Sequence, residues 1–306
     1  MTTLDVVLLT ADKYLDSEQQ SPLAQNVRLE DGLVAEALAN EGLRIAITSW
    51  SDPLFDWSST KYVLVRTPWD YFERSKEFMN WFDNTSRMTI FINSAALIRW
   101  NFDKNYLKEL QKKGIVIPNT YFISKGFQGT LKEVLQIAEK AFGRSSTTWV
   151  LKPCIAAGAY NTFKFTHSEI ETYEERFATL ISEADFMLQE FQESIALKGE
   201  LSLMFFGTSF SHAVVKRAKP GDFRVQDDYG GTVNMHQASQ EEIDFALSVL
   251  HACNELPLYS RVDILEDNDQ SLALAELEIF EPELWFRFQP ESASVLAKTI
   301  IKTYFA

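Results

Sequence analysis

The stretch "RVDILEDNDQSLALAELEIFEP", from Arg261 to Pro282, decides how the C-terminal part of the chain folds. Two apolar runs flank the polar segment "EDNDQS", a pattern typical of two strands joined by a turn. Because residues i and i+2 of a strand share a face, Glu276 and Glu278 point to the same side. A hairpin brings Asp263 alongside them.

Three carboxylates on one sheet face repel one another and lose hydration unless a cation lies among them. Clustered hard oxygen ligands suit Mg²⁺, above all Mg²⁺ that also holds nucleotide phosphates. The alternative is a solvated hairpin face, since acidic alternation is common. Spacing alone leaves both interpretations open.

The composition limits the classes of function. The chain has 306 residues and is 46% hydrophobic, enough for a buried core and about two domains. With 43 acidic and 29 basic residues the net charge is -14, which argues against nucleic-acid binding and against binding to anionic membranes. Two cysteines make no disulfide framework, which favours a reducing, cytoplasmic compartment. The apolar run near the N-terminus lacks a basic flank and is too short to span a membrane, so we expect neither a signal peptide nor a membrane helix.

The order of apolar patterns predicts an α/β chain in three parts. Residues 1–101 alternate strand and helix patterns, which predicts a parallel sheet. Residues 102–190 begin with a helix over "DKNYLKELQKKG", with Lys104 in its first turn, and contain a hairpin around "AAGAY". Residues 191–306 read as antiparallel strands with helices, an α+β arrangement that includes the acidic hairpin.

Several charged residues have two interpretations each. Lys152 ends an apolar strand before the small-residue loop "AAGAYNT", where it can contact phosphate as a point charge or remain a surface lysine. Arg224 lies in the Gly-flanked loop "GDFRVQ", where its guanidinium can bind a carboxylate or phosphoryl group, or stay solvated. Glu200 begins a strand, where it can accept ribose hydroxyls or serve as an edge charge. Lys104, taken alone, reads as a solvated helix lysine.

Arg66 and Trp69 follow a predicted parallel strand. Ligands favour the carboxyl ends of such strands, so both residues are candidate substrate contacts. The histidines have no ligand spacing that would indicate zinc, and no Gly-x-Ser-x-Gly motif is present.

Taken in order from about Asn101 onward, these motifs resemble the ATP-grasp enzymes, such as glutathione synthetase and the ribosomal-protein modification ligases. The resemblance implies an ATP-grasp fold with an N-terminal parallel α/β domain, and ATP with two Mg²⁺ ions or Mn²⁺ as cofactors. Pieces such as "GELSLMFFGTSFSHAVVK" and "ELEIFEPELWF" look closer to a subgroup of small-molecule ligases that includes the ring-forming ligase of cycloserine biosynthesis.

The resemblance also implies roles for individual residues. Asp263, Glu276 and Glu278 would hold the metal ions, and Arg224 and Lys152 would be catalytic. Substrate contacts would come from Arg66, Trp69, Arg224 and Gln226. The nucleotide would be bound by Lys104, Lys152, Ala157, Gly158, Gln189, Glu190, Phe191 and Glu200.

Three departures from the family pattern stand out. Glutathione synthetases have Asn where this chain has Glu278, the loop after Lys152 has a single glycine, and the strand after Glu200 lacks an arginine. Glutathione synthesis is therefore not expected.

The implied reaction is ATP-dependent joining of a carboxylate to an amine or similar nucleophile through an acyl phosphate, on a small amino-acid-like molecule. Two rival classes stay open, namely a phosphotransferase on the same fold and a non-catalytic nucleotide-binding protein. The family resemblance also allows a homodimer.

Overall fold

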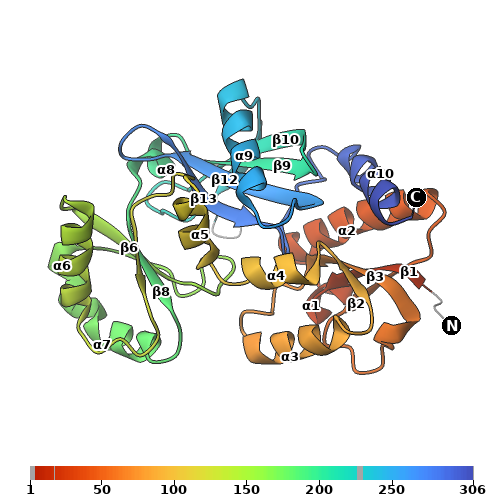
Figure 1. Ribbon diagram of the computed structural model, residues 1–306, viewed down its shortest axis with the longest axis horizontal. Coiled ribbons are helices and arrows are strands. Elements are labelled where there is room, and N and C mark those ends of the chain that lie inside the picture. Colours follow the sequence, from red (N-terminus) through yellow and green to blue (C-terminus); the bar gives the residue numbers. More distant parts are fainter. Residues whose placement is uncertain (1–3, 17, 226–229, 306) are drawn as a thin grey trace.

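The computed structural model describes residues 4–16, 18–225 and 230–305. Its N-terminal part is a four-stranded parallel sheet of order β2-β1-β3-β4, as the alternating sequence patterns predict (Figure 1). The strands are β1 (Leu4–Thr10), β2 (Ile45–Ser49), β3 (Thr60–Thr67) and β4 (Ile90–Ile92). The helices are α1 (Asp12–Leu15), α2 (Pro22–Asn40), α3 (Ser75–Thr85) and α4 (Ala95–Asn101), with a 3₁₀ turn at Trp57–Ser59.

The central part is an antiparallel sheet of order β5-β8-β6-β7. Its strands are β5 (Thr120–Ile123), β6 (Thr148–Pro153), β7 (Phe163–Thr166) and β8 (Phe186–Glu190). Helices α6 (Leu131–Phe142) and α7 (Ile170–Ile181) pack on this sheet and enclose a core of their own, at the left of Figure 1. A capping box between Thr130 and Glu133 begins α6, which ends at Gly143 with φ +68°.

The C-terminal part is a five-stranded antiparallel sheet of order β11-β10-β9-β12-β13. Its strands are β9 (Glu200–Phe206), β10 (Ser209–Arg217), β11 (Thr232–His236), β12 (Tyr259–Glu266) and β13 (Leu272–Glu278). Helix α9 (Gln240–Ala252) and helix α5 (Tyr106–Lys112) share one apolar cluster with it, while α8 (Glu193–Leu197) precedes β9.

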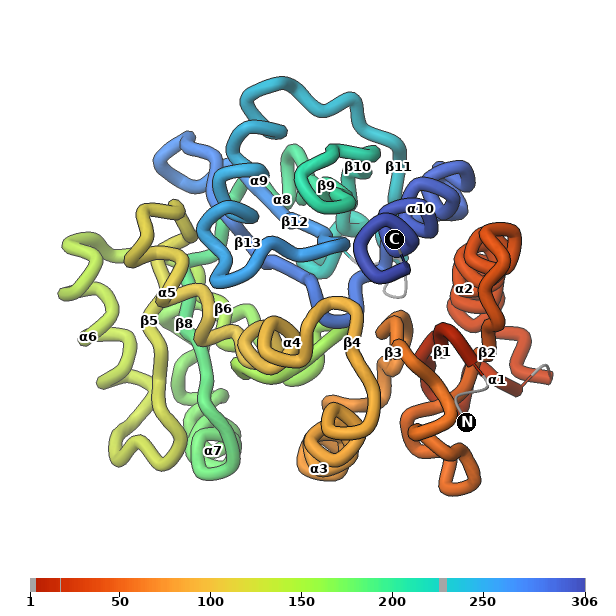
Figure 2. The backbone as a smooth tube through the Cα atoms, turned by 45° about the vertical axis from the view of Figure 1, so that its right-hand side comes forward, coloured from red at the N-terminus to blue at the C-terminus, as the bar shows by residue number. Residues whose placement is uncertain are grey.

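Two helices cross the predicted part boundaries. Helix α5 comes from the segment assigned to the central part but packs on the C-terminal sheet. The final helix, α10 (Ser292–Tyr304), packs on α2 in the N-terminal part (Figure 2). Each sheet nevertheless lies within one of the ranges 1–101, 102–190 and 191–306. The N- and C-terminal parts thus share a core, while the central sheet and its two helices have a separate one.

Among the described helices, none has the length and apolar character needed to cross a membrane.

Candidate active site

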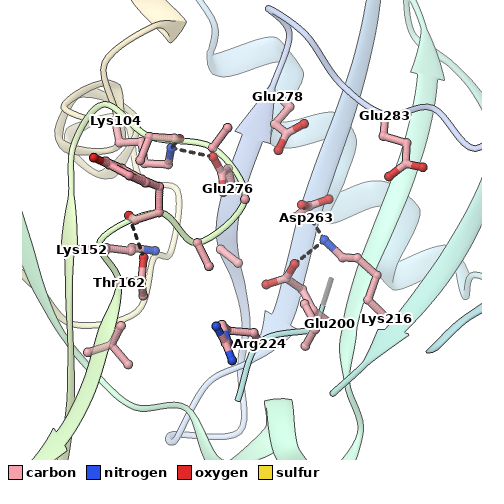
Figure 3. Close-up of a pocket in the computed structure, with 18 of the residues that line it drawn as sticks. Lys104, Lys152, Thr162, Glu200, Lys216, Arg224, Asp263, Glu276, Glu278 and Glu283 are labelled. Atoms are coloured by element: carbon pink, nitrogen blue, oxygen red, sulfur yellow. Dashed lines mark hydrogen bonds and ion pairs between the residues drawn. The ribbon is translucent and has the colours of Figure 1, made fainter. Parts of the chain in front are cut away.

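A pocket of about 470 Å³ opens between the central and C-terminal sheets and reaches the N-terminal part. Its size falls within the range of small-molecule sites. At one end the lining is largely apolar and comes from both sheets, including Pro118, Val150, Phe191, Ile195 and Leu265. Further in, charged side chains converge from β6, from the turn before α5 and from β9, β10, β12 and β13 (Figure 3).

The acidic hairpin lines this pocket with its charged face. In the register of β12 and β13, Asp263 lies opposite Glu276 and Arg261 lies opposite Glu278. Asp263, Glu276 and Glu278 all line the pocket, as the alternation of the sequence indicated.

Two cations that the sequence analysis did not select hold the hairpin carboxylates. Arg261 makes two hydrogen bonds of 2.8 Å to Asp263 and also pairs with Glu278. Lys216 on β10 lies 2.9 Å from Asp263 and 2.5 Å from Glu200. Arg261 could have been predicted from the sequence, because it lies two residues before Asp263 and so shares its face of the strand. Lys216 could not, because 46 residues separate it from Asp263 and only the strand order brings the two together.

The carboxyl groups differ in their affinity for protons. Burial alone would raise the pKa of Asp263, but Arg261 and Lys216 lower it to about 2. Burial acts in the same way on Glu276, and Lys104 and Lys152 lower its pKa. Burial and the neighbouring carboxylates raise the pKa of Glu278 well above its usual value. Negative charge is thus concentrated around Glu278, where an added cation would be favoured.

The donor chemistry of these residues fits Mg²⁺, but they form no complete cage. Within residues 4–16, 18–225 and 230–305, no three His, Cys, Asp or Glu side chains gather closely enough to hold a metal ion by themselves. Mg²⁺ is commonly bound by one or two carboxylates together with water and substrate phosphates. Asp263 and Glu276, which face each other across the hairpin, suit that kind of site.

We expect Asp263→Asn to lower the free energy of unfolding by roughly 3 kcal/mol, because it removes the shared charge partner of two buried cations. Urea denaturation would measure the change. The control is Asp269→Asn in the exposed turn of the same hairpin, where a surface ion pair contributes at most about 1 kcal/mol. Equal stability of Asp263→Asn and the wild type would show that this network does not support the fold.

Lys104 lies in the turn before α5, not in the first turn of a helix as the sequence pattern predicted. Its backbone N–H bonds to the carbonyl of Cys154, and the Asp103 carboxylate accepts from the N–H of Asn105, so the helix begins later. The Lys104 ammonium donates to the carbonyl of Ala156 at 2.6 Å and lies 3.0 Å from Glu276. It therefore connects the loop after β6 to the acidic hairpin.

Lys152 ends β6 and points into the pocket opposite the hairpin (Figure 3). Burial lowers the pKa of its ammonium group, and it makes no ion pair with any described residue. A half-buried cation without an ion pair is suited to an anionic ligand.

The loop between β6 and β7 carries Ala157 and Gly158, both of which line the pocket. Gly158 has φ +57°, a conformation that glycine adopts readily. Ala157 packs against the N-terminal core cluster, and the Tyr160 ring lies 5.2 Å from that of Phe72. The loop thus lies between the pocket and the N-terminal part.

The predicted nucleotide hinge is buried and lines the apolar end of the pocket. Gln189 donates to the Thr120 hydroxyl at 2.7 Å, and the Glu190 carboxylate accepts from Arg144 at 2.9 Å. Both side chains are therefore occupied within the protein. The backbone N–H groups of Glu190 and Phe191 are also bonded within the protein, so this segment contributes mainly the ring of Phe191 to the pocket lining.

Glu200 begins β9 and lines the pocket beside Lys216. Gly199, which precedes it, has φ +88°, and a Cβ there would lie 2.4 Å from the carbonyl oxygen of Lys216. Glycine is therefore required for the close approach that places Glu200 against Lys216.

Arg224 lines the pocket, with its guanidinium bonded to Asp222 at 3.0 and 2.8 Å. This pair lowers the pKa of the Asp222 carboxyl below its usual value. Gln226, the other predicted contact of this loop, lies outside the described residues.

The two predicted substrate contacts near the end of β3, Trp69 and Arg66, differ in whether they line the pocket. Trp69 lines the pocket and donates to Glu281. Arg66 does not line it, because the side chain is fully buried, pairs with Asp31 at 3.2 Å and donates to the carbonyl of Pro282. We therefore correct the prediction for Arg66, which links α2 to the segment after β13.

The comparisons with known proteins agree with this arrangement. Residues 6–93 match the family described as the N-terminal domain of D-cycloserine synthetase DcsG. The chain is 28% identical over 278 residues to the cycloserine biosynthesis protein DcsG of Streptomyces lavendulae, covering 87% of this chain and 90% of that protein.

Solved structures decide the fold. The crystal structure of D-cycloserine synthetase DcsG superposes with a TM-score of 0.85 at 24% identity, over 97% of this chain and 98% of that one. The ATP-grasp ligase PsnB, complexed with a precursor variant, Mg and ADP, superposes with a TM-score of 0.64 at 14% identity, over 99% of both chains. The chain has the ATP-grasp fold. The predicted ATP-grasp fold and the predicted resemblance to the cycloserine ligase are both confirmed.

A further part of the pocket lining comes from the segment after β13, from Ile279 to Trp285. The sequence analysis used it for the resemblance alone, yet Glu281, Glu283 and Trp285 all line the pocket.

Proposed function

We propose that this chain is an ATP-dependent ligase that activates a carboxylate of a small amino-acid-like molecule as an acyl phosphate and joins it to an amine nitrogen. ADP and phosphate are the other products. The observation that carries the proposal is the pocket, in which Lys104 and Lys152 line one wall and Asp263 and Glu276 line the other. The similarity to DcsG, a cycloserine biosynthesis protein, supports a small amino-acid-like substrate.

Each wall has a distinct task in this proposal. Phe191, Val150 and Leu265 cover the base of the nucleotide, and Lys152 and the loop after it neutralise its phosphates. Mg²⁺ held by Asp263 and Glu276 would neutralise phosphate charge and orient the transferred group. Lys104, which bonds the loop to Glu276, keeps the two walls at a fixed separation.

The chemical step is the transfer of the γ-phosphoryl group to a substrate carboxylate oxygen. The amine nitrogen then attacks the carbonyl carbon, and the C–O bond to phosphate breaks as the C–N bond forms. Because the protein supplies no covalent intermediate in this scheme, its contribution is positioning and charge stabilisation. Arg224 lines the pocket with a planar fork that suits the acyl phosphate.

The proposal is tested by a screen for ADP release over amino acids and dipeptides of both configurations, with mass spectrometry of the products. We expect ADP, phosphate and a product that has lost one water relative to its precursors. A phosphorylated product that accumulates instead would assign the chain to the phosphotransferases. Formation of AMP and pyrophosphate would exclude the acyl-phosphate route.

A further inference from the structure

The pocket extends past the charged walls to a second end against the N-terminal part. We call this the acceptor end and define it by Lys13, Trp69, Phe72, Glu281 and Trp285, all of which line the pocket. The segment that supplies Glu281 and Trp285 follows β13 directly. The acceptor end therefore combines side chains of the N-terminal part with side chains from the end of the acidic hairpin.

Glu281 is the distinctive residue of the acceptor end. It is only 9% exposed, and the indole N–H of Trp69 donates to its carboxylate at 3.2 Å and to its carbonyl at 3.0 Å. The hydroxyl of Tyr71 adjoins the same carboxylate. These donors fix the orientation of the carboxylate, and none of them carries a charge that would balance it.

Three cations of the described chain lie near the acceptor end, and none of them forms an ion pair with Glu281. Lys13 donates to the backbone carbonyl of Trp69. Lys104 pairs with Glu276, and Arg261 pairs with Asp263 and Glu278. Across the described residues, no ion pair involves Glu281, whereas Asp263, Glu276 and Glu278 each have at least one. A buried carboxylate that lines a cavity and lacks a cation is a binding group for a cationic ligand.

The aromatic side chains of the acceptor end suit the same ligand. Trp285 is 2% exposed, has φ +46°, and its ring lies 5.0 Å from the Arg261 guanidinium and 5.7 Å from the Lys216 ammonium. The Trp285 ring therefore lies beside these two cations and also lines the pocket. Trp69 adds a second indole beside Glu281, and indole faces attract ammonium groups.

We propose that Glu281 binds the protonated amino group of an amino-acid substrate and so selects amino acids over simple carboxylic acids. This role of Glu281 rests on the proposed function, because the ligand is the substrate of the same site. A charge-assisted hydrogen bond from the ammonium group would supply the selectivity. The substrate carboxylate then extends from the acceptor end toward Lys104, Arg224 and the phosphoryl group.

The test compares alanine, in both configurations, with propanoate, which lacks only the amino group. Binding is followed by the fluorescence of the pocket tryptophans in the presence of Mg²⁺ and a non-hydrolysable ATP analogue. We expect the wild type to bind one configuration of alanine at least about tenfold more tightly than propanoate, and Glu281→Gln to lose that preference. The affinity for the ATP analogue should stay within about twofold, which also reports a folded pocket. The matched control, Glu77→Gln on the exposed face of α3, should keep the wild-type preference.

Two results would overturn the assignment. One is an unchanged preference for alanine in Glu281→Gln, or no preference in the wild type. The other is a raised Mg²⁺ requirement for binding the ATP analogue, which would make Glu281 a metal ligand instead. If the wild type fails to bind the ATP analogue at all, the proposed function itself is wrong, and that outcome is distinct from both.

Discussion

Glu276→Gln should lower turnover by at least about a hundredfold while the protein stays folded. Glu276 lies opposite Asp263 on the pocket face of the hairpin and pairs with Lys104. Gln keeps the shape and one oxygen but removes the charge that a phosphate-bound cation requires. Loss of one preorganised electrostatic contact of this kind costs roughly 2.7–4 kcal/mol of transition-state stabilisation. Steady-state turnover at saturating ATP and Mg²⁺ measures the effect.

The matched control is Glu266→Gln on the same hairpin. Glu266 pairs with Lys198 on the exposed surface, so its loss should leave turnover unchanged. Circular dichroism and urea denaturation establish that both variants are folded. Near-normal turnover of a folded Glu276→Gln protein would remove this carboxylate from the metal site.

We expect Lys152 to stabilise bound ATP in the ground state and Arg224 to stabilise the transition state. Lys152 is half-buried and has no ion pair among the described residues, so we expect its charge to bind the nucleotide phosphates. Lys152→Ala should therefore mainly raise the dissociation constant for ATP. Arg224→Ala should leave that constant within a few-fold and lower turnover by about a hundredfold or more, because the acyl phosphate forms only late.

Two further variants sharpen this comparison. Arg224→Lys should not restore turnover, since an ammonium cannot reproduce a two-pronged contact. Lys132→Ala, an exposed lysine on α6 of the same part, should change neither constant. Should Arg224→Ala lose ATP binding yet keep turnover at saturating ATP, the arginine would be a simple nucleotide contact.

Local alternation in the sequence was enough to predict the acidic hairpin and the side its carboxylates share. The shared face of Asp263 and Glu276 could be predicted because side chains alternate between the two faces of any strand. A short stretch of sequence is enough to show this alternation. The same holds for the parallel and antiparallel parts, which follow from strand and helix patterns between neighbouring elements.

Ion-pair and hydrogen-bond partners from distant segments of the chain could not be predicted from local alternation. Lys216 meets Asp263 because β9 lies between β10 and β12, and Glu281 meets Trp69 because the segment after β13 returns to the N-terminal part. Arg66 was misassigned because the rule for strand ends does not say whether a side chain faces a ligand or the interior. Its burial against Asp31 is a property of the packed structure.

The transfer of oxygen from substrate to phosphate tests the central claim most directly. The carboxylate substrate identified by the ADP-release screen would be labelled with ¹⁸O in both carboxylate oxygens, and the phosphate released in one turnover analysed by mass spectrometry. The acyl-phosphate route predicts one ¹⁸O atom in inorganic phosphate for each molecule of product. Unlabelled phosphate, or ¹⁸O found in AMP, would contradict it.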